Sequence, residues 1–246
     1  MNKDKIYFAF DFHLGIPNRV ESHNREKRIV NWLTKIEKDA KAIYLVGDIF
    51  DFWFEYKKVV PKGFVRLLGK LATLTDNGTS IHLLVGNHDL WAKDYLEKEV
   101  GMIIHHKSMI IEEQSKKIFI SHGDGLGKGD IQYKLIKKLF TSKICQWAFS
   151  RLHPNLALSL AHKWSNNSRK KHNAPFVSKE KEILFCYCIK KQKLKPVDYY
   201  IFGHRHTPIE LEVDHQAKYI NLGDWLTHNT YAVLTEGIIQ LKKYPK

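Results

Sequence analysis

Cysteine and long apolar runs are scarce in this sequence of 246 residues. Its three cysteines, Cys145, Cys186 and Cys188, are too few for the disulfide framework that stabilises small secreted domains. It contains no run of about 18 apolar residues, so no transmembrane helix is expected. The apolar stretch near the N-terminus is too short for a signal peptide, and we therefore expect a cytoplasmic protein.

Acidic residues are in the minority. The chain has 26 of them against 40 lysines and arginines, which gives a formal net charge of +14 at pH 7. It has no basic tail and no low-complexity segment, so this charge belongs to the folded body. Such a surface is either simply solvated or faces an anionic partner: nucleic acid, anionic lipid or a phosphorylated substrate. Charge alone does not choose among these.

A regular alternation of strand and helix patterns is present throughout the chain. Buried strands are predicted from apolar runs at residues 6–10, 43–46, 81–85, 102–104, 108–112, 117–121 and 199–202. Helical patterns occupy residues 24–37, 61–74, 130–168 and 178–192. Pro61 is expected at the start of the second helix, and short strands after residue 209 are expected to close a second sheet. The alternation predicts an α/β fold.

Residues 126–173 differ in character from the rest of the chain. Basic residues are interleaved there with large apolar ones, and a polar run from Ser165 to Asn173 ends the segment. We predict that this segment is a helical insertion, a cap over the strand ends. Residues 1–125 and 174–246 then form the core.

Polar side chains follow several predicted strands at the point where each strand ends. They are Asp11, His13, Asp48, Asn87, His88, His122, His204 and His206. Ligands collect at the carboxyl ends of strands in open α/β sheets, so we expect these side chains to meet. Carboxylate, amide and imidazole ligands together suit Mn²⁺, Fe²⁺ or Zn²⁺ better than Ca²⁺ or Mg²⁺. The candidates suffice for two metals that share one carboxylate, the usual arrangement for in-line attack at phosphorus.

Each of these signals has a plainer interpretation when taken alone, because a histidine after a strand is often structural and an aspartate after glycine often marks a turn. Together they resemble the signature of the calcineurin-like metallophosphoesterases: Asp11-x-His13, Gly47-Asp48, Gly86-Asn87-His88-Asp89, His122-Gly123 and Gly203-His204-x-His206. The resemblance spans nearly the whole chain. It implies a four-layer fold, two β-sheets flanked by helices, with a helical cap over the metal site.

The resemblance also implies the roles of the residues. One metal would be held by Asp11, His13, Asp48 and His206, and the other by Asp48, Asn87, His122 and His204. Asp48 would bridge the two metals, for which Mn²⁺ is the expected ion, and a hydroxide between them would be the nucleophile. His88 would act as an acid or stabilise the phosphoryl oxygens, so Asp48 and His88 are the predicted catalytic residues.

Within this superfamily, the spacing of the motifs and the residues between them resemble the family of UDP-2,3-diacylglucosamine diphosphatases of lipid A synthesis, in its Bacteroidetes-type form. The matching stretches include DFHLG, GDIFDFW, HGDGLG and GHRHTP. The resemblance implies cleavage of the substrate's pyrophosphate to UMP and 2,3-diacylglucosamine 1-phosphate, by a protein held peripherally at the cytoplasmic face of the inner membrane. It implies substrate contacts from Asn87, His88, Asn167, Ser168, Arg169, Lys171 and His204.

A substrate with acyl chains also needs apolar surface on the protein. The candidates in the insertion are Phe140, Trp147, Phe149, Leu152, Leu156 and Leu160, and the alternative is that they form the insertion's own core. The aromatic run Phe52-Trp53-Phe54 is expected in the core and in the wall of a pocket. No motif surrounds His105 or His106, and no role is predicted for them.

Two other interpretations stay open. The charge of +14 and His88, which stands where proteobacterial members have arginine, also fit another dimetal phosphoesterase, such as a nuclease or a nucleotide phosphodiesterase. A nuclease has no need of an apolar insertion, so no nucleic-acid partner is expected. A non-catalytic scaffold of the same fold would have lost metal ligands, whereas this chain retains every one.

Overall fold

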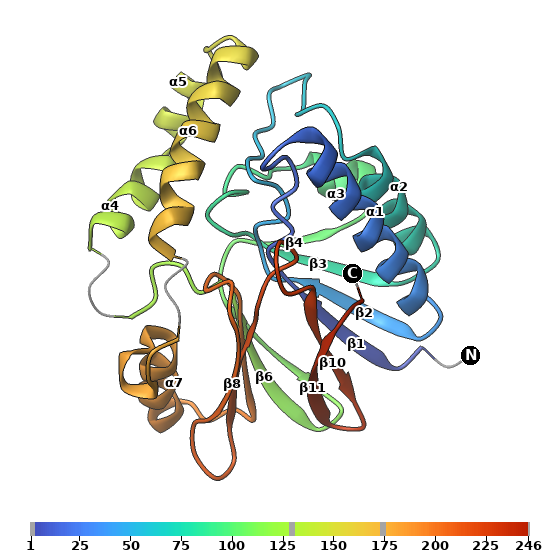
Figure 1. Ribbon diagram of the computed structural model, residues 1–246, viewed down its shortest axis with the longest axis vertical. Coiled ribbons are helices and arrows are strands. Elements are labelled where there is room, and N and C mark those ends of the chain that lie inside the picture. Colours follow the sequence, from blue (N-terminus) through green and yellow to red (C-terminus); the bar gives the residue numbers. More distant parts are fainter. Residues whose placement is uncertain (1–2, 128–130, 173–175, 246) are drawn as a thin grey trace.

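The computed structural model describes residues 3–127, 131–172 and 176–245, and the side chains at 131–133, 162, 164 and 166–172 lie outside that description. Its centre is a pair of β-sheets that pack face to face (Figure 1). The first sheet has the order β11 (Ile238–Lys243), β10 (Thr230–Thr235), β1 (Lys5–Ala9), β2 (Ala40–Leu45), β3 (Ser80–Leu84) and β4 (Ile103–His105). The second has the order β5 (Met109–Glu113), β6 (Lys116–Ser121), β7 (Tyr199–Phe202), β9 (Lys218–Leu222) and β8 (Pro208–Glu212).

Helices cover the outer face of each sheet (Figure 1). The first sheet is covered by α1 (Arg19–Ile36), α2 (Val65–Asp76) and α3 (Tyr95–Val100), and the second by α7 (Ile183–Leu194), which follows the short 3-10 turn η1 (Lys179–Lys181). Apolar clusters fill the spaces between these layers. The cluster between the first helices and the first sheet includes Trp32 of α1, the cluster between the two sheets includes Phe8, and the cluster between the second sheet and α7 includes Phe202. The described residues therefore have the predicted four-layer order.

Strand β1 shows why the buried strands read as continuous apolar runs. Side chains alternate between the two faces of a strand. Ile6 and Phe8 accordingly face the second sheet, whereas Tyr7 and Ala9 face the helices. Both faces are covered from Ile6 onward, so every position from Ile6 to Ala9 is apolar. β1, β2, β3 and β4 are mutually parallel, as are β6, β7 and β9, and their carboxyl ends lie at one edge of the sandwich.

The helices of the predicted insertion are α4 (Ile131–Phe140), α5 (Lys143–Phe149) and α6 (Pro154–His172), which lie together beside the sandwich (Figure 1). The indole Nε1 of Trp91 in the core donates a hydrogen bond to the carbonyl oxygen of Phe140, at 2.6 Å. The division into core and cap at residues 126 and 173 stays a prediction. In the described part of the chain, no helix is both long enough and apolar enough to cross a membrane.

Two predicted helix starts are wrong. The first helix begins at Arg19 because Asn18 caps it, accepting a hydrogen bond from the backbone N–H of Glu21 at 3.0 Å. The second begins at Val65 rather than Pro61, because the backbone of Phe64 is left-handed, with φ of 58°, and cannot continue a right-handed helix.

Three further expectations also need correction. The helical pattern predicted to end at residue 168 continues to His172 in α6, so most of the polar run is helical. The short helix α3, ahead of β4, was not predicted. The C-terminal strands divide between the sheets: β8 and β9 extend the second, whereas β10 pairs with β1 and brings β11 into the first. Strand pairing is non-local, and the sequence of the tail carries no signal for its partner.

Candidate active site

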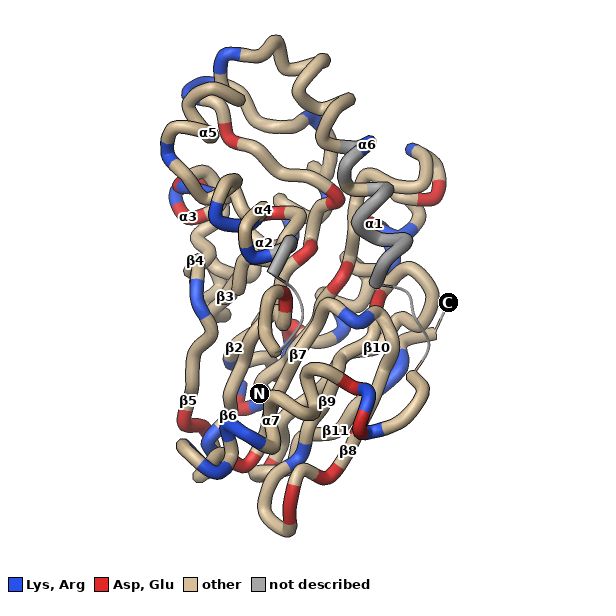
Figure 2. The backbone as a smooth tube through the Cα atoms, turned by 90° about the vertical axis from the view of Figure 1, so that its left-hand side faces the viewer, with Lys and Arg blue, Asp and Glu red and all other residues tan. Residues whose placement is uncertain are grey.

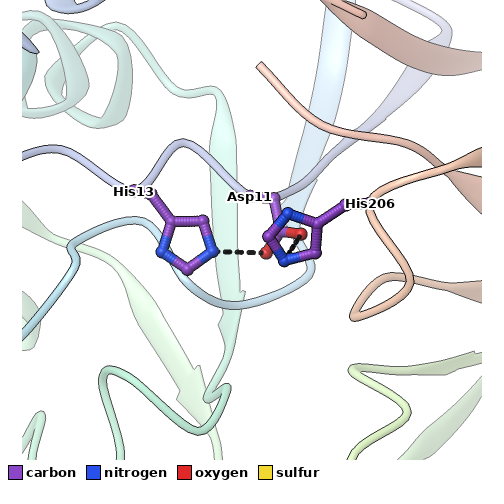
Figure 3. Close-up of side chains that lie close together, drawn as sticks. All are labelled: Asp11, His13 and His206. Carbon is purple, nitrogen blue, oxygen red and sulfur yellow. Dashed lines mark ion pairs between the residues drawn. The ribbon is translucent and has the colours of Figure 1, made fainter. Parts of the chain in front are cut away.

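The residues predicted for the first metal lie together at the shared edge of the sheets. His206 Nε2 is 2.9 Å from Asp11 Oδ2, and His13 Nε2 is 3.4 Å from Asp11 Oδ1 (Figure 3). His13 Nε2 is also 3.8 Å from Asp48 Oδ2. Asp11 and His13 follow β1, Asp48 follows β2 and His206 follows β7. Loops far apart in the sequence thus converge here because parallel strands end at one edge.

The residues predicted for the second metal adjoin the same aspartate. His122 Nε2 lies 3.4 Å from Asp48 Oδ2 and 3.1 Å from Asn87 Oδ1. The ring of His204 is 5.3 Å from that of His122, centroid to centroid. Asp48 Oδ2 therefore has ring nitrogens from both groups within 4 Å, which is where a bridging oxygen has to be.

The backbone at this edge adopts conformations that side chains other than glycine rarely take. Positive φ angles, between 40° and 69°, occur at Asp11, His13, Asp48, His204 and His206. Glycine is required beside them, since a Cβ on Gly47 would lie 2.5 Å from His122 Nδ1 and one on Gly86 would collide with Asp48 Oδ1. These unfavourable backbone conformations direct the side chains toward a common point.

The donor set suits divalent cations. Asp11 and Asp48 are both buried, and neither oxygen of Asp11 accepts a hydrogen bond from the described residues. Burial, and then the charges of Asp224 and Asp89, raises the pKa of Asp11 well above its usual value. Burial also raises the pKa of Asp48, and the charge of Asp11 adds to this. Buried carboxylates in such proximity need compensating positive charge.

The histidines present the lone pairs that a metal needs. His122 Nδ1 donates to the carbonyl oxygen of Val46 at 2.8 Å, so its Nε2 carries the lone pair and faces Asp48. Burial lowers the pKa of His122 to about 4, so the ring is neutral at pH 7. A neutral ring whose other nitrogen is anchored to the backbone is the usual form of a metal-ligating histidine.

His88 lies beside these residues, and its ring is anchored to the backbone in the same way, but its Nε2 is farther from Asp48 than that of His122. Its Nδ1 donates to the carbonyl oxygen of Asp51 at 2.8 Å, and its Nε2 lies 4.0 Å from Asp48 Oδ2. Its backbone N–H donates to Asp48 Oδ1 at 2.9 Å. The Ser165 hydroxyl of α6 donates to Asp51 Oδ1 at 2.8 Å and lies 3.1 Å from His88 Nδ1. Helix α6 therefore reaches the site through a buried hydroxyl.

The model of a protein family described as "Calcineurin-like phosphoesterase" matches residues 5–208 of the chain. The chain belongs to the calcineurin-like phosphoesterase family. The predicted α/β metallophosphoesterase fold is thereby confirmed.

The phosphoesterase also has curated relatives over nearly its whole length. A UDP-2,3-diacylglucosamine hydrolase of Porphyromonas gingivalis is 36% identical in an alignment that covers 94% of each chain. A protein of the same name from Edwardsiella ictaluri is 27% identical, with 88% of this chain and 85% of that one covered. Another from Vibrio vulnificus is 24% identical, with 97% of each chain covered.

Several carboxylates for which no role was predicted lie at the phosphoesterase site. Asp89 accepts hydrogen bonds from the backbone N–H groups of Gly86, at 2.6 Å, and Ile49, at 3.1 Å, and so ties two ligand loops together. Asp224 Oδ2 lies 3.8 Å from His206 Nδ1, where it can orient that ring. Asp224 follows a glycine at the end of β9, as Asp48 does at the end of β2. The same local signal, an apolar run followed by glycine and aspartate, therefore marks both positions.

Asp51 is a further buried carboxylate of the site. Its Oδ1 is 3.6 Å from His13 Nδ1, and with His13 and His88 it forms a second group of side chains spaced as metal ligands are. It lies three residues after Asp48, still in the buried loop beyond β2. Its side chain also accepts the Ser165 hydroxyl, so Asp51 links His13, His88 and α6.

The predicted substrate contacts divide into two groups. Asn87, His88 and His204 lie among the predicted metal ligands, and their contact with substrate stays a prediction. The side chains of Asn167, Ser168, Arg169 and Lys171 lie outside the described part, although their backbone belongs to α6.

An apolar cavity of about 210 Å³ adjoins Asn87 and His88. Its remaining wall is built from Phe52, Trp53, Leu90, Trp91, Phe140, Phe149, Leu160 and Ala161. Of the predicted acyl contacts, Phe140, Phe149 and Leu160 line it. Leu152 is half-buried, whereas Trp147 and Leu156 are exposed, with 60% and 53% of their surface accessible. Phe52 and Trp53 form pocket wall, as expected for the aromatic run.

Proposed function

We propose that this phosphoesterase hydrolyses the pyrophosphate of UDP-2,3-diacylglucosamine to UMP and 2,3-diacylglucosamine 1-phosphate. The observation that carries the proposal is the apolar cavity at Asn87 and His88, directly beside the cluster of carboxylates and imidazoles. A substrate that joins a diphosphate to acyl chains needs both environments next to each other. The names of the relatives, up to 36% identical, support the same substrate.

Membership in a metallophosphoesterase family implies divalent metals. We assign Asp11, His13, Asp48 and His206 to one ion and Asp48, Asn87, His122 and His204 to the other, with Mn²⁺ as the expected metal. When bound, two such cations supply Lewis acidity toward the phosphoryl oxygens and lower the pKa of water.

The protein's own residues orient the reaction. Attack by a water-derived oxygen on the UMP phosphorus forms one P–O bond, and the bond to the bridging oxygen breaks. The electron pair leaves with 2,3-diacylglucosamine 1-phosphate. His88 Nδ1 is anchored to the Asp51 carbonyl, so its Nε2 faces the centre and, when protonated, donates to a phosphoryl or leaving oxygen.

The acyl chains of the substrate belong in the apolar cavity. Each buried CH₂ contributes about 0.8 kcal/mol, so a cavity between the core and the insertion favours a lipid over a soluble diphosphate. We assign residues 126–173 as the cap over this cavity and residues 1–125 and 174–246 as the core. Asn167, Ser168, Arg169 and Lys171, on the last turns of α6, are proposed contacts for the glucosamine and the diphosphate.

The outer surface of the insertion supports a location at the cytoplasmic face of the inner membrane. Leu135, Leu139, Ile144 and Trp147 are all more than half exposed, at 64%, 55%, 77% and 60%. Lys and Arg occur along α4 and beside α5 (Figure 2). Basic residues near an anionic leaflet contribute about 1 kcal/mol each, and exposed apolar side chains add to that attraction.

A comparison of substrates tests the proposal. Purified protein with Mn²⁺ is incubated with UDP-2,3-diacylglucosamine, with bis-p-nitrophenyl phosphate and with single-stranded DNA. UMP release from the lipid should far exceed turnover of the other two. Faster cleavage of DNA would instead assign the chain to the nucleases and end the lipid interpretation.

A pair of variants tests the cavity. Phe149→Asp puts a charge into the apolar wall and should lower kcat/KM for the lipid at least about tenfold, while turnover of bis-p-nitrophenyl phosphate changes little. Trp147→Asp, on the same helix but exposed, is the matched control in detergent solution. Equal losses on both substrates for Phe149→Asp would mean that the cavity does not bind acyl chains.

A further inference from the structure

Another cavity, of about 110 Å³, adjoins His122, whose Nε2 lies 3.1 Å from Asn87 Oδ1 in the wall of the apolar cavity. It lies where the ends of β3, β6 and the connection from β4 to β5 meet. Its lining includes His122 itself, together with the polar side chains His105, His106, Lys107, Ser108 and Lys137. A predicted metal ligand thus forms part of its wall, just as the predicted ligand Asn87 forms part of the wall of the apolar cavity.

The two cavities differ in chemical character. Aromatic and aliphatic side chains dominate the wall of the cavity beside His88, whereas lysine, histidine and serine dominate this one. Lys137 comes from α4 and pairs with the buried Asp124, Nζ to Oδ2 at 2.5 Å. Lys107 and Ser108 are exposed at the mouth. Leu84 and Val85 supply a small apolar surface within it.

The proposed substrate likewise has one apolar and one polar part, joined by its pyrophosphate. One side is an acylated sugar, which suits the apolar cavity. The other side is uridine, whose ribose hydroxyls and uracil carbonyls would lose their hydrogen bonds with water in an apolar cavity. A polar cavity with cationic donors at its mouth replaces those bonds.

We infer that the cavity lined by His105, His106, Lys107, Ser108 and Lys137 binds the nucleoside half of the substrate, and a nucleoside monophosphate after the reaction. Lys107 and Ser108 donate to the oxygens of the ribose or the base, and Leu84 and Val85 pack against the flat ring. The metal centre then lies between a nucleotide subsite and a lipid subsite. This inference rests on the proposed function for the identity of the base.

A competing location exists on the other side of the site. A groove of about 610 Å³ is lined by Arg19, Lys62 and Arg66 together with Phe52 and Phe64. It also offers cations and aromatic rings. Its described lining contains none of the predicted metal ligands, so a nucleotide there would be farther from the centre. Lys62 provides the matched control.

Inhibition by UMP separates the two locations. With Mn²⁺-loaded protein and bis-p-nitrophenyl phosphate, inhibition constants are measured for UMP and for inorganic phosphate, which occupies only the metal centre. Lys107→Ala should raise the ratio of the UMP constant to the phosphate constant about tenfold, the effect of losing one charged hydrogen bond. Lys62→Ala should leave that ratio unchanged. A shift with Lys62→Ala alone would overturn the inference.

Photo-crosslinking gives an answer that does not depend on a variant. 4-Thio-UMP, irradiated with the Mn²⁺-loaded wild-type protein, should label residues 103–109, as read by peptide mass spectrometry. Labelling of residues 61–66 instead would refute the assignment. If the lipid substrate is not hydrolysed, the proposed function fails. If it is hydrolysed while the label and the inhibition ratio point elsewhere, this inference alone fails.

Discussion

At the scale of single residues, the site is built at a conformational cost. Asp11, Asp48 and His204 are among the residues with left-handed backbone, each of which costs roughly 1–3 kcal/mol. Hydrogen bonds across the loops offset part of it: Asp48 accepts from the backbone of His88, and Asp89 from that of Ile49. Side chains placed in this way are selected for position rather than for stability.

Asp48→Ala tests the shared ligand. Removing the carboxylate that adjoins both groups should lower the metal content of the purified protein and reduce kcat by at least about 10²-fold. Metal analysis by inductively coupled plasma mass spectrometry and a turnover assay measure the two effects. Asp198→Ala, a carboxylate far from the site, is the control. Wild-type activity in Asp48→Ala would rule out the assigned centre.

His88→Ala separates proton transfer from metal binding. His88 contributes through Nε2 and is outside both assigned ligand sets, so kcat should fall about 10²–10⁴-fold while metal content stays near that of the wild type. Parallel metal analysis and kinetics at saturating substrate check this. Loss of metal from His88→Ala would show that the ring is a ligand.

At the scale of elements, helix α7 fixes the loop that carries two predicted ligands. Glu182 precedes α7 and is buried, and its Oε2 lies 3.3 Å from Arg205 Nη2. Its Oε1 lies 3.5 Å from the hydroxyl of Tyr219 on β9. Arg205 stands between His204 and His206. A helix on the outer face of the second sheet thereby positions the His-x-His loop at the sheet edge.

Glu182→Ala should therefore weaken both folding and metal binding. It leaves a partly buried guanidinium without this carboxylate, and breaking such a pair costs roughly 3 kcal/mol of unfolding free energy. Urea denaturation and Mn²⁺ titration measure the loss. Glu180→Ala, an exposed glutamate two residues earlier, should change neither. Unaltered Mn²⁺ affinity in Glu182→Ala would mean that the loop holds its position without α7.

At the scale of the whole molecule, the metal site and the stability of the fold are linked. The sheets meet at the edge where Asp11, Asp48 and Asp224 are buried together, and their mutual repulsion opposes folding until cations are bound. Ligands that bind only the native state stabilise it by about 2.7 kcal/mol at 100 times their dissociation constant.

Removal of metal with EDTA should consequently lower the thermal unfolding midpoint, and Mn²⁺ should restore it in a concentration-dependent way. Differential scanning calorimetry of the stripped and reloaded protein checks this. Ca²⁺, which prefers all-oxygen ligand shells, is the control and should restore less. Identical midpoints for the stripped and Mn²⁺-loaded protein would contradict the link.

His82, whose Nδ1 lies 3.0 Å from His105 Nε2 and which is outside both assigned ligand sets, should set part of the pH dependence of stability. Burial, and then the neighbouring His105, lowers the pKa of His82 from 6.5 to about 4. Between these pH values the unfolded chain holds a proton on His82 that the folded chain lacks. The contribution of neutral His82 to the free energy of unfolding is therefore fully present above about pH 6.5, and it decreases as the pH drops toward 4.

His82→Phe tests this contribution. The ring stacks on Tyr44, with centroids 4.4 Å apart, and phenylalanine retains that packing without the titrating group. The decrease in unfolding midpoint from pH 7 to pH 5 should be smaller in His82→Phe than in the wild type. His215→Phe, at an exposed position, is the control and should show the wild-type decrease. If the decrease in unfolding midpoint is the same in His82→Phe as in the wild type, His82 is excluded as a source of the pH dependence.

The sequence by itself determined the α/β class, the family and the candidate ligands. These signals are local: each is an apolar run that ends in a short polar motif, and parallel strands bring such ends to one edge whatever lies between them. His122 and Asp48, far apart in the chain, are predictable as neighbours for that reason.

Only the tertiary structure decided what surrounds the centre. The pairing of β10 with β1, the approach of Ser165 to Asp51 and the approach of Asp224 to His206 each join segments that share no local pattern. The apolar and the polar cavity are likewise formed by side chains from separate elements. Packing between elements depends on shape and on partners distant in the chain, and neither is contained in the residues of one segment.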